Sequence, residues 1–548
     1  MGEEVDGRDS ASLSRRRFLG LAGALGAAGA VIGTSGAGAS VLGGAARRFA
    51  DPAFGARRVA TPSLPANPFT LGVASGDPTA DGFVLWTRLA PDPLAPGGAG
   101  GMDPVLVPVR WIVTRDENLQ QVEREGTFVT SPAVAHSVHA VLRGLQPDRP
   151  YWYRFRVGDW ESPVGRARTF PPRWQPASRL RFGFASCQSW TDGYYAAYRD
   201  LAADDLDLVV HLGDYIYEGG GSGVRDHDGP EIVTIDQYRN RYALYKGDAD
   251  LQAAHALAPW LTTWDDHEAD NNYAGFFPEA DSITPTPEEF VARRVAAYRA
   301  WWEHMPVRGP APLGTELRIR RRADFGSLAR FHVLDTRQYR TDQPCAGSSV
   351  SDVGGRCAEA FADDAQMLGA EQEQWLFDGL DASSSVWNVL AQQIVFSQLA
   401  FLPGTPGVYN LDQWDGYVAA RQRVLDFLAD RRPANPVVIT GDIHASGVSD
   451  VKADFDDPAS DVLGTEFVGT SITSGSPSVF QAVLPLLLAN NPHLKWADAV
   501  SRGWVRCEVT PDEWRTDYRF VADVTDPGST VTTAKSWVVE AGGTVHPA

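Results

Sequence analysis

Two apolar runs in the chain end on Gly-Asp: LDLVVHLGDYIY at residues 206–217 and NPVVITGDIHAS at residues 435–446. Short apolar runs of this kind are typical of buried strands in an α/β sheet. Ligands of such sheets bind just beyond the carboxyl ends of the strands. Carboxylates, a tyrosine and a histidine stand there, so the pattern predicts a metal site. Gly-Asp is also common in turns, and a single such end leaves that alternative open.

Length and charge limit the class of protein. A chain of 548 residues predicts two or three domains, and 43% hydrophobic with 22% charged residues indicates a globular protein. The formal net charge of −20 disfavours nucleic acid and anionic membranes as partners. We therefore expect no nucleic-acid-binding surface, and we expect a monomer.

The N-terminus carries a targeting pattern. Ser14–Leu19, with the sequence SRRRFL, fits the twin-arginine motif, and a Gly/Ala-rich segment continues to about Ala46. The segment is too weakly hydrophobic to favour a membrane anchor, so residues 1–46 are predicted to be a signal peptide. This predicts the twin-arginine translocase as a partner and a secreted or extracytoplasmic location, in the periplasm or cell envelope. In an exported protein, Cys345 and Cys357 are expected to form a disulfide.

The rest of the chain divides into regions that differ in the pattern of their apolar and turn residues. Residues 47–65 are predicted to be a linker, and residues 66–172 show short alternating strands, typical of a β-sandwich like fibronectin type III or immunoglobulin domains. Residues 178–548 show an α/β pattern, with a helix predicted from Thr286 to Met305. Further helices are predicted within 370–380 and 415–432, and a hairpin within 504–524. No P-loop, HExxH or GxSxG pattern occurs, which excludes the commonest NTPases, zinc peptidases and serine hydrolases.

Further chemistry-bearing residues follow other apolar runs of the α/β part. They are Cys187, Asp214, Tyr217, Asp265, Asp266, His267, Glu268, Asp335, Arg337, Gln392, Gln393, Asp442 and His444. Two cations held close together need one bridging carboxylate and separate further ligands. Asp214 is placed to bridge, and Tyr217 could reach one of the two cations.

The forms ASCQS (185–189), GDYIYE (213–218), WDDHE (264–268), LDTRQYR (334–340) and TGDIHAS (440–446) resemble a known family. They are similar to the alkaline phosphatase D (PhoD-like) branch of calcineurin-like, purple-acid-phosphatase-type metallophosphoesterases, over nearly the whole mature chain. The resemblance implies a four-layer α/β/β/α metallophosphoesterase sandwich after the N-terminal β-sandwich. It also implies a secreted, metal-dependent alkaline phosphatase that hydrolyses phosphate esters by attack of a metal-bound hydroxide.

The resemblance further implies two kinds of metal ion. With Asp214 as the bridge, Cys187, Tyr217 and His444 would hold Fe3+, because thiolate and phenolate suit a ferric ion. The second site would contain Asp266 and Asp442, with Gln392 or Gln393 nearby, and these oxygen donors favour Ca2+ over Zn2+. Other candidate calcium ligands, for which ordinary hydrogen bonding is the alternative, are Asn271, Asn272 and Glu466.

Two side chains are candidates for contacts with the substrate. Arg337 has a planar guanidinium that suits phosphoryl oxygens, and its alternative role is a structural salt bridge with Asp335. His267 could protonate or orient the leaving group, and its alternative role is hydrogen bonding beside the site. His211 lies inside an apolar run and is predicted to be a core residue.

Three functions remain open at this point. The first is the phosphatase described above. The second keeps the same site but acts on phosphodiesters, as a phosphodiesterase or phospholipase D-type enzyme, so the ester could be a small molecule, a lipid or a polymer. The third is a non-catalytic exported binding protein, which the presence of Asp214, Asp442 and His444 disfavours.

Overall fold

The computed structural model describes residue 64 and residues 66–548, except 228, 281, 346–351, 405 and 477. The predicted signal peptide and almost all of the predicted linker lie outside the described residues. The described residues belong to one compact unit. No helix in this described part is long and apolar enough to cross a membrane.

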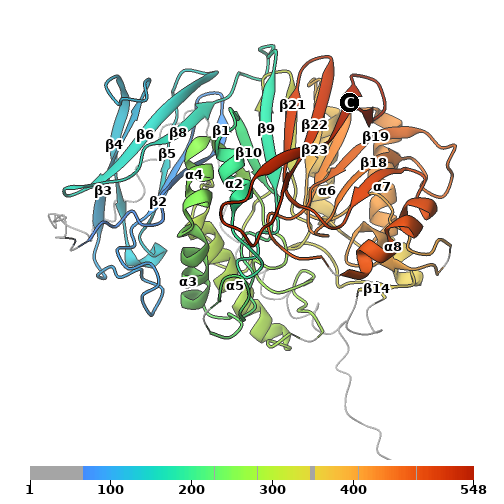
Figure 1. Ribbon diagram of the computed structural model, residues 1–548, viewed down its shortest axis with the longest axis horizontal. Coiled ribbons are helices and arrows are strands. Elements are labelled where there is room, and N and C mark those ends of the chain that lie inside the picture. Colours follow the sequence, from blue (N-terminus) through green and yellow to red (C-terminus); the bar gives the residue numbers. More distant parts are fainter. Residues whose placement is uncertain are drawn as a thin grey trace, which may run out of the picture. The chain divides into compact units, whose positions relative to one another are not determined.

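The largest sheet has ten strands and contains strands from both ends of the described part of the chain (Figure 1). Its strands, in spatial order, are β24 (His546–Pro547), β23 (Val531–Glu540), β22 (Glu513–Val521), β21 (Arg502–Val509), β9 (Leu180–Ala185), β10 (Leu208–His211), β11 (Pro259–Thr262), β1 (Val73–Thr79), β2 (Gly82–Arg88) and β5 (Ser137–Val141). Strands β9, β10 and β11 run parallel, so their carboxyl ends share one edge of the sheet.

The second sheet has seven strands. In spatial order they are β12 (Arg321–Phe325), β13 (Ala329–Val333), β15 (Trp387–Ala391), β17 (Pro436–Thr440), β19 (Val462–Val468), β18 (Ser446–Lys452) and β20 (Leu494–Asp498). Strands β13, β15, β17 and β19 are parallel. One apolar core contains side chains of both sheets, including Phe182 and Val210 from the first and Phe331 and Ile439 from the second. The two sheets therefore pack against each other.

Helices pack on the sheet faces that do not meet. They are α2 (Ala196–Ala202), α3 (Ile235–Lys246), α4 (Ala249–Leu257), α5 (Pro287–His304), α6 (Gly369–Asp381), α7 (Val418–Arg431) and α8 (Ser478–Asn490). Helices α2 to α5 share a core with Val209 of β10 and Trp260 of β11. Helices α6 and α7 share another core with Leu390 of β15 and Val438 of β17.

The N-terminal region is joined to the rest by strand pairing. A five-stranded sheet contains β3 (Val107–Thr114), β4 (Val122–Thr130), β6 (Arg149–Val157), β7 (Trp160–Glu161) and β8 (Gly165–Thr169). It shares a core with β1, β2 and β5, which contains Phe83, Leu85, Tyr153 and Phe155. Strand β1 also pairs in parallel with β11, so strands of the N-terminal region continue the ten-stranded sheet.

Several local predictions are confirmed. Helix α5 begins with a capping box in which Thr286 and Glu289 bond each other's backbone amides, and Pro287 occupies the first turn. Helices α6 and α7 and the hairpin β21–β22 form where the patterns predicted them. The Cys345–Cys357 disulfide is also present. A short pair of strands, β14 (Val353–Gly354) and β16 (Tyr409–Asn410), lies close to that bond in the sequence.

Candidate metal centre

The carboxyl ends of the parallel strands bring the predicted residues together from two sheets. In the ten-stranded sheet, Cys187 follows β9, Asp214 follows β10, and Asp266 follows β11. In the seven-stranded sheet, Arg337 follows β13 and Asp442 follows β17. Because the two sheets pack face to face, ligands from both can surround one region.

Three groups of acidic, thiol and imidazole side chains there have ligand atoms within 4.8 Å of one another. The groups are Cys187–Asp214–His444, Asp214–Asp266–His267 and Asp265–Asp266–Asp442. Asp214 belongs to the first two groups and Asp266 to the last two. Shared carboxylates of this kind are what two neighbouring cations require.

The backbone at this site is in an unusual conformation. Cys187, Asp214, Asp442 and His444 all have positive φ angles, of 58°, 54°, 68° and 53°. Such angles are costly for residues with a Cβ atom and tend to cluster at functional sites. Gly213 precedes Asp214 at φ 113°, and a Cβ atom there would lie 2.4 Å from the Cβ of Asp265. The Gly-Asp turn therefore lets two ligand-bearing loops approach closely.

The Tyr217 hydroxyl lies beside the Cys187–Asp214–His444 group. The Tyr217 hydroxyl lies 3.0 Å from Asp214 Oδ2 and 3.0 Å from His444 Nε2. The Ser474 hydroxyl lies 2.7 Å from both the Tyr217 hydroxyl and the Cys187 carbonyl, and its single hydrogen can be donated to either. Burial and the Asp214 carboxylate raise the pKa of both the Cys187 thiol and the Tyr217 hydroxyl. A cation is what would favour their ionised, ligating forms.

Arg337 is the centre of the acidic group. Its guanidinium is completely buried and pairs with Asp265, with Asp412 at 2.9 Å and with Asp442 at 3.3 Å. Burial raises the pKa of Asp442 to about 7, against the attraction of Arg337. Although burial acts in the opposite direction, Arg337 and His267 hold the pKa of Asp266 below its usual range. The sequence left open a salt bridge between the Arg337 guanidinium and Asp335. In the structure, Asp335 instead accepts the backbone N–H of Arg337.

His267 is held by a carboxylate on one side. Its Nδ1 lies 2.7 Å from Glu218 Oε2, and its ring packs on Tyr217 with 4.2 Å between the ring centroids. Burial lowers the pKa of His267, but Glu218 and Asp266 outweigh burial and the net shift is well above the usual value. His267 forms a group with Asp214 and Asp266 in which one ligand atom of each residue lies within 4.8 Å of the others.

Glu268 was among the residues predicted at this edge, but no role was predicted for it. Its carboxylate connects the loops that follow β10 and β11. Its carboxylate accepts the backbone N–H groups of Asp214, Tyr215 and Asp265 at 3.0, 2.8 and 2.9 Å. Asp412 and Gln413 were not predicted at all. Both lie in a loop before α7 that carries no strand-end pattern, so the sequence offered no signal for them.

The other candidate calcium ligands are engaged by protein groups. Asn272 donates its backbone N–H to Asp266 Oδ2 at 2.7 Å. The side chains of Gln392 and Gln393 bond neighbouring strand-end residues, including Thr440 and Thr263. Glu466 accepts hydrogen bonds from Phe396, Ser397 and Thr440. The ligand roles of Asn272, Gln392 and Gln393 stay predictions, as does that of Asn271, which lies beside Glu218.

Buried carboxylate oxygens without hydrogen bonds indicate whether these side chains fit a metal ion. Asp214 Oδ1 and Asp265 Oδ2 are buried and lack hydrogen-bond partners among the described residues, while Asp266 Oδ1 lacks a hydrogen bond but lies 3.5 Å from Arg337 Nη2. An unpaired buried carboxylate oxygen is costly, and a bound cation removes that cost. The donor set therefore fits metal ions.

Comparisons with known proteins show the family to which the chain belongs. The family model of the PhoD-like phosphatase matches residues 182–518, and that of the PhoD-like phosphatase N-terminal domain matches residues 55–171. The chain belongs to the PhoD-like phosphatase family. The predicted family and the prediction of a phosphoric ester hydrolase are thereby confirmed.

Two relatives show how far the PhoD-like likeness extends. Alkaline phosphatase D of Bacillus subtilis (strain 168) is 46% identical over 492 residues, which are 88% of this chain and 82% of that protein. A solved structure of PhoD matches with a TM-score of 0.83 and 46% identity, covering 89% of this chain and 93% of that chain.

Proposed function

We propose that this PhoD-like phosphatase is a secreted, metal-dependent alkaline phosphatase. The observation that carries the proposal is the set of three ligand groups joined by Asp214 and Asp266, in which Asp214 Oδ1 and Asp265 Oδ2 are buried without a hydrogen-bond partner in the part of the chain that the structure describes. A site that only bound a ligand would not need carboxylates shared in this way between neighbouring cation positions. The non-catalytic binding protein is therefore disfavoured.

We assign Fe3+ to Cys187, Tyr217 and His444, with Asp214 as the bridge. Thiolate and phenolate donors support a ferric ion. We assign Ca2+ to the carboxylates Asp266 and Asp442, because oxygen donors favour a hard cation. Bound cations would activate water and neutralise charge on the phosphoryl oxygens.

The protein groups have separate tasks around these cations. Ser474 orients the Tyr217 hydroxyl, and Glu268 fixes the backbone that carries Asp214. Glu218 holds one nitrogen of His267, so the other nitrogen can hold a proton for the leaving oxygen. Arg337 compensates the charge of Asp265 and Asp442, and it stays the predicted donor to phosphoryl oxygens.

We also propose the organisation of the chain. Residues 1–46 would be the signal peptide read by the twin-arginine translocase, and residues 47–65 a linker. Residues 66–172 would form the fibronectin III-like β-sandwich, which the shared core of β1, β2 and β5 with the five-stranded sheet supports. Residues 178–548 would form the four-layer α/β/β/α catalytic domain, which the cores between the two sheets and beneath the helices support.

The test is hydrolysis of p-nitrophenyl phosphate and bis-p-nitrophenyl phosphate at alkaline pH by the purified mature protein. We expect hydrolysis that is lost on calcium chelation and returns with calcium. A preference for the diester would favour the phosphodiesterase alternative. Loss of activity that neither iron nor calcium restores would contradict the proposed metals.

A second test addresses the iron site through a readout other than activity. Cys187→Ser replaces a thiolate by a poor ferric ligand, so we expect lower iron content by elemental analysis and loss of visible colour. Cys507→Ser is the matched control, because Cys507 is the other free cysteine among the described residues and is buried away from these groups. Unchanged iron in Cys187→Ser would make Cys187 a packing residue.

A further inference from the structure

The Cys345–Cys357 disulfide packs against strand β16 and the residue that follows it. Cys345 contacts an apolar cluster that contains Tyr409 and Leu411. Strand β14, which lies between the two cysteines in the sequence, pairs with β16. The backbone N–H of Leu411 also donates to the Asp352 carbonyl at 2.7 Å. The disulfide and these contacts therefore hold Asp352 beside β16.

The Asp352 side chain reaches the proposed calcium site through one residue. Its Oδ2 accepts a hydrogen bond from Asn272 Nδ2, and its Oδ1 accepts one of 3.0 Å from Gln343 Nε2. The backbone N–H of Asn272 donates to Asp266 Oδ2 at 2.7 Å, and its carbonyl accepts Arg340 at 3.0 Å. Asn272 has a φ angle of 48°, which side-chain-bearing residues seldom adopt. Contacts on both sides of Asn272 therefore fix the backbone N–H that faces Asp266.

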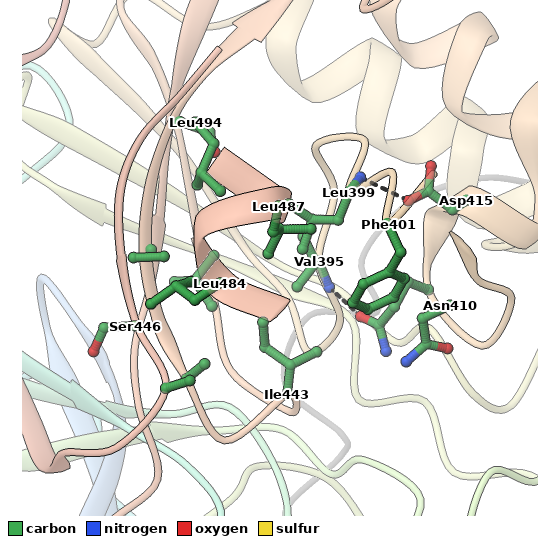
Figure 2. Close-up of a pocket in the computed structure, with 17 residues that line it drawn as sticks. Val395, Leu399, Phe401, Asn410, Asp415, Ile443, Ser446, Leu484, Leu487 and Leu494 are labelled. Carbon is green, nitrogen blue, oxygen red and sulfur yellow. Dashed lines mark hydrogen bonds between the residues drawn. The ribbon is translucent and has the colours of Figure 1, made fainter. Parts of the chain in front are cut away.

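The chain after β16 reaches the other carboxylate of the proposed calcium site. Gln413 donates to Asp442 Oδ2 at 2.6 Å and accepts the backbone N–H of Val395 at 2.6 Å. Figure 2 draws the bond from Val395 as a dashed line, with Asn410 of β16 beside it. Because Val395 occupies the amide oxygen of Gln413, the amide nitrogen is directed at Asp442. The chain beside the disulfide thus supports both Asp266 and Asp442.

We propose that Asp352 is a positioning residue of the calcium site, held in place by the Cys345–Cys357 disulfide, and the proposal rests on the Ca2+ assignment made above. Asp352 belongs to none of the three ligand groups, so it acts on the site through Asn272. Loss of a group that orients metal ligands typically weakens metal binding by about ten- to a hundred-fold. Among the described residues, no hydrogen bond joins the Asp352 side chain to a proposed iron ligand. Calcium affinity should therefore depend on Asp352, and iron content should not.

The first experiment measures calcium and iron separately in Asp352→Ala. The mature protein, freed of calcium but not of iron, is titrated with calcium against a fluorescent calcium chelator, and iron is measured by elemental analysis. We expect the Kd for calcium to rise by about ten-fold or more at unchanged iron content. Asp148→Ala is the matched control, because Asp148 also accepts a glutamine amide, that of Gln175 at 3.2 Å, but in the N-terminal region.

The second experiment tests whether the disulfide acts through Asp352. The variant Cys345→Ser/Cys357→Ser removes the bond, and we expect a similar rise in the Kd for calcium. Adding Asp352→Ala to this variant should raise the Kd by less than about two-fold more, because both changes release the same contact with Asn272, whereas independent effects multiply. If the cysteine variant does not fold, the wild type is reduced with a phosphine and water, which leave two thiols and the phosphine oxide. The reagent is removed before the titration.

The outcomes separate this inference from the proposed function. Unchanged calcium affinity in Asp352→Ala, or effects of Asp352→Ala and disulfide loss that multiply, would overturn the inference while hydrolysis by the wild type stands. Equal losses of calcium and iron in Asp352→Ala would show a general disturbance of the centre and would overturn it as well. A wild type that binds no calcium would overturn both the Ca2+ assignment and this inference.

Discussion

The two Gly-Asp strand ends look alike in sequence, but the structure supports them in different ways. At the end of β10, the backbone N–H of Asp214 bonds Glu268, while Asp214 Oδ1 has no hydrogen-bond partner in the described part of the chain. At the end of β17, both carboxylate oxygens of Asp442 are engaged, by Arg337 at 3.3 Å and by Gln413 at 2.6 Å.

This difference separates a carboxylate with one unbonded oxygen from a carboxylate whose two oxygens are both bonded by protein side chains. Asp214 has its backbone fixed and its oxygen available, which suits a ligand shared between two cations. Asp442 shares the Arg337 guanidinium with Asp265 and Asp412, so loss of Arg337 disturbs several buried carboxylates at once. We therefore expect substitutions at the first strand end to affect metals and catalysis, and those around the second to affect folding as well.

The largest effect is expected at Asp214. Asp214→Asn removes the bridging charge, so we expect kcat/KM to fall by about a thousand-fold or more and both metals to bind more weakly. Asp335→Asn is the matched control, because Asp335 is also buried after a strand but belongs to none of the three ligand groups. Wild-type-like turnover and metal content in Asp214→Asn would contradict the bridging role.

Substitution of Arg337 tests how far the second strand end, after β17, depends on this buried arginine for stability. Arg337→Gln leaves Asp265 and Asp442 without their buried arginine, while Asp412 keeps Arg340, so we expect the free energy of unfolding to fall by about 3–5 kcal/mol. Arg337→Lys keeps the charge and should lose less. Denaturant titration gives the stability, and initial rates give KM. Unchanged stability with a raised KM would instead support direct binding of the phosphoryl group.

Glu268 and Glu466 sharpen the comparison, because each is a buried carboxylate beneath one strand end. Glu268 accepts the N–H of Asp214 itself, whereas Glu466 accepts the hydroxyl of Thr440, two residues before Asp442. We expect Glu268→Gln and Glu466→Gln each to cost about 1–3 kcal/mol in stability. We expect kcat to fall about ten-fold or more only in Glu268→Gln. Equal losses of kcat would show that neither carboxylate positions Asp214 specifically.

The sequence predicted the residues at the strand ends better than the residues that hydrogen-bond or pair with them. Asp214, Asp442 and Cys187 were found because an apolar run ending in a polar residue marks the edge of a parallel sheet. Asp412 and Gln413 were missed because they approach through a loop, and loops carry no periodic pattern. The N-terminal strands were correctly predicted, but not the pairing of β1 with β11, since pairing between distant segments leaves no local signal.

The smallest expected effect is a pH dependence of stability that belongs to the first ligand group. Burial lowers the pKa of His444 to about 4, below its unfolded value of about 6.5. Unfolding then takes up a proton between pH 6.5 and 4, so the metal-free protein should become less stable as the pH falls through this window.

The difference between wild type and His444→Gln isolates this contribution. Other buried histidines with lowered pKa values, such as His136 and His227, are present in both proteins and cancel. After chelation of the metals, we expect the wild type to lose about 1–3 kcal/mol more than His444→Gln between pH 6.5 and 4. Urea titrations across that range measure it. Parallel curves for the two proteins would mean that His444 is already protonated or solvated in the folded state, and its assignment as a neutral imidazole ligand would fall with it.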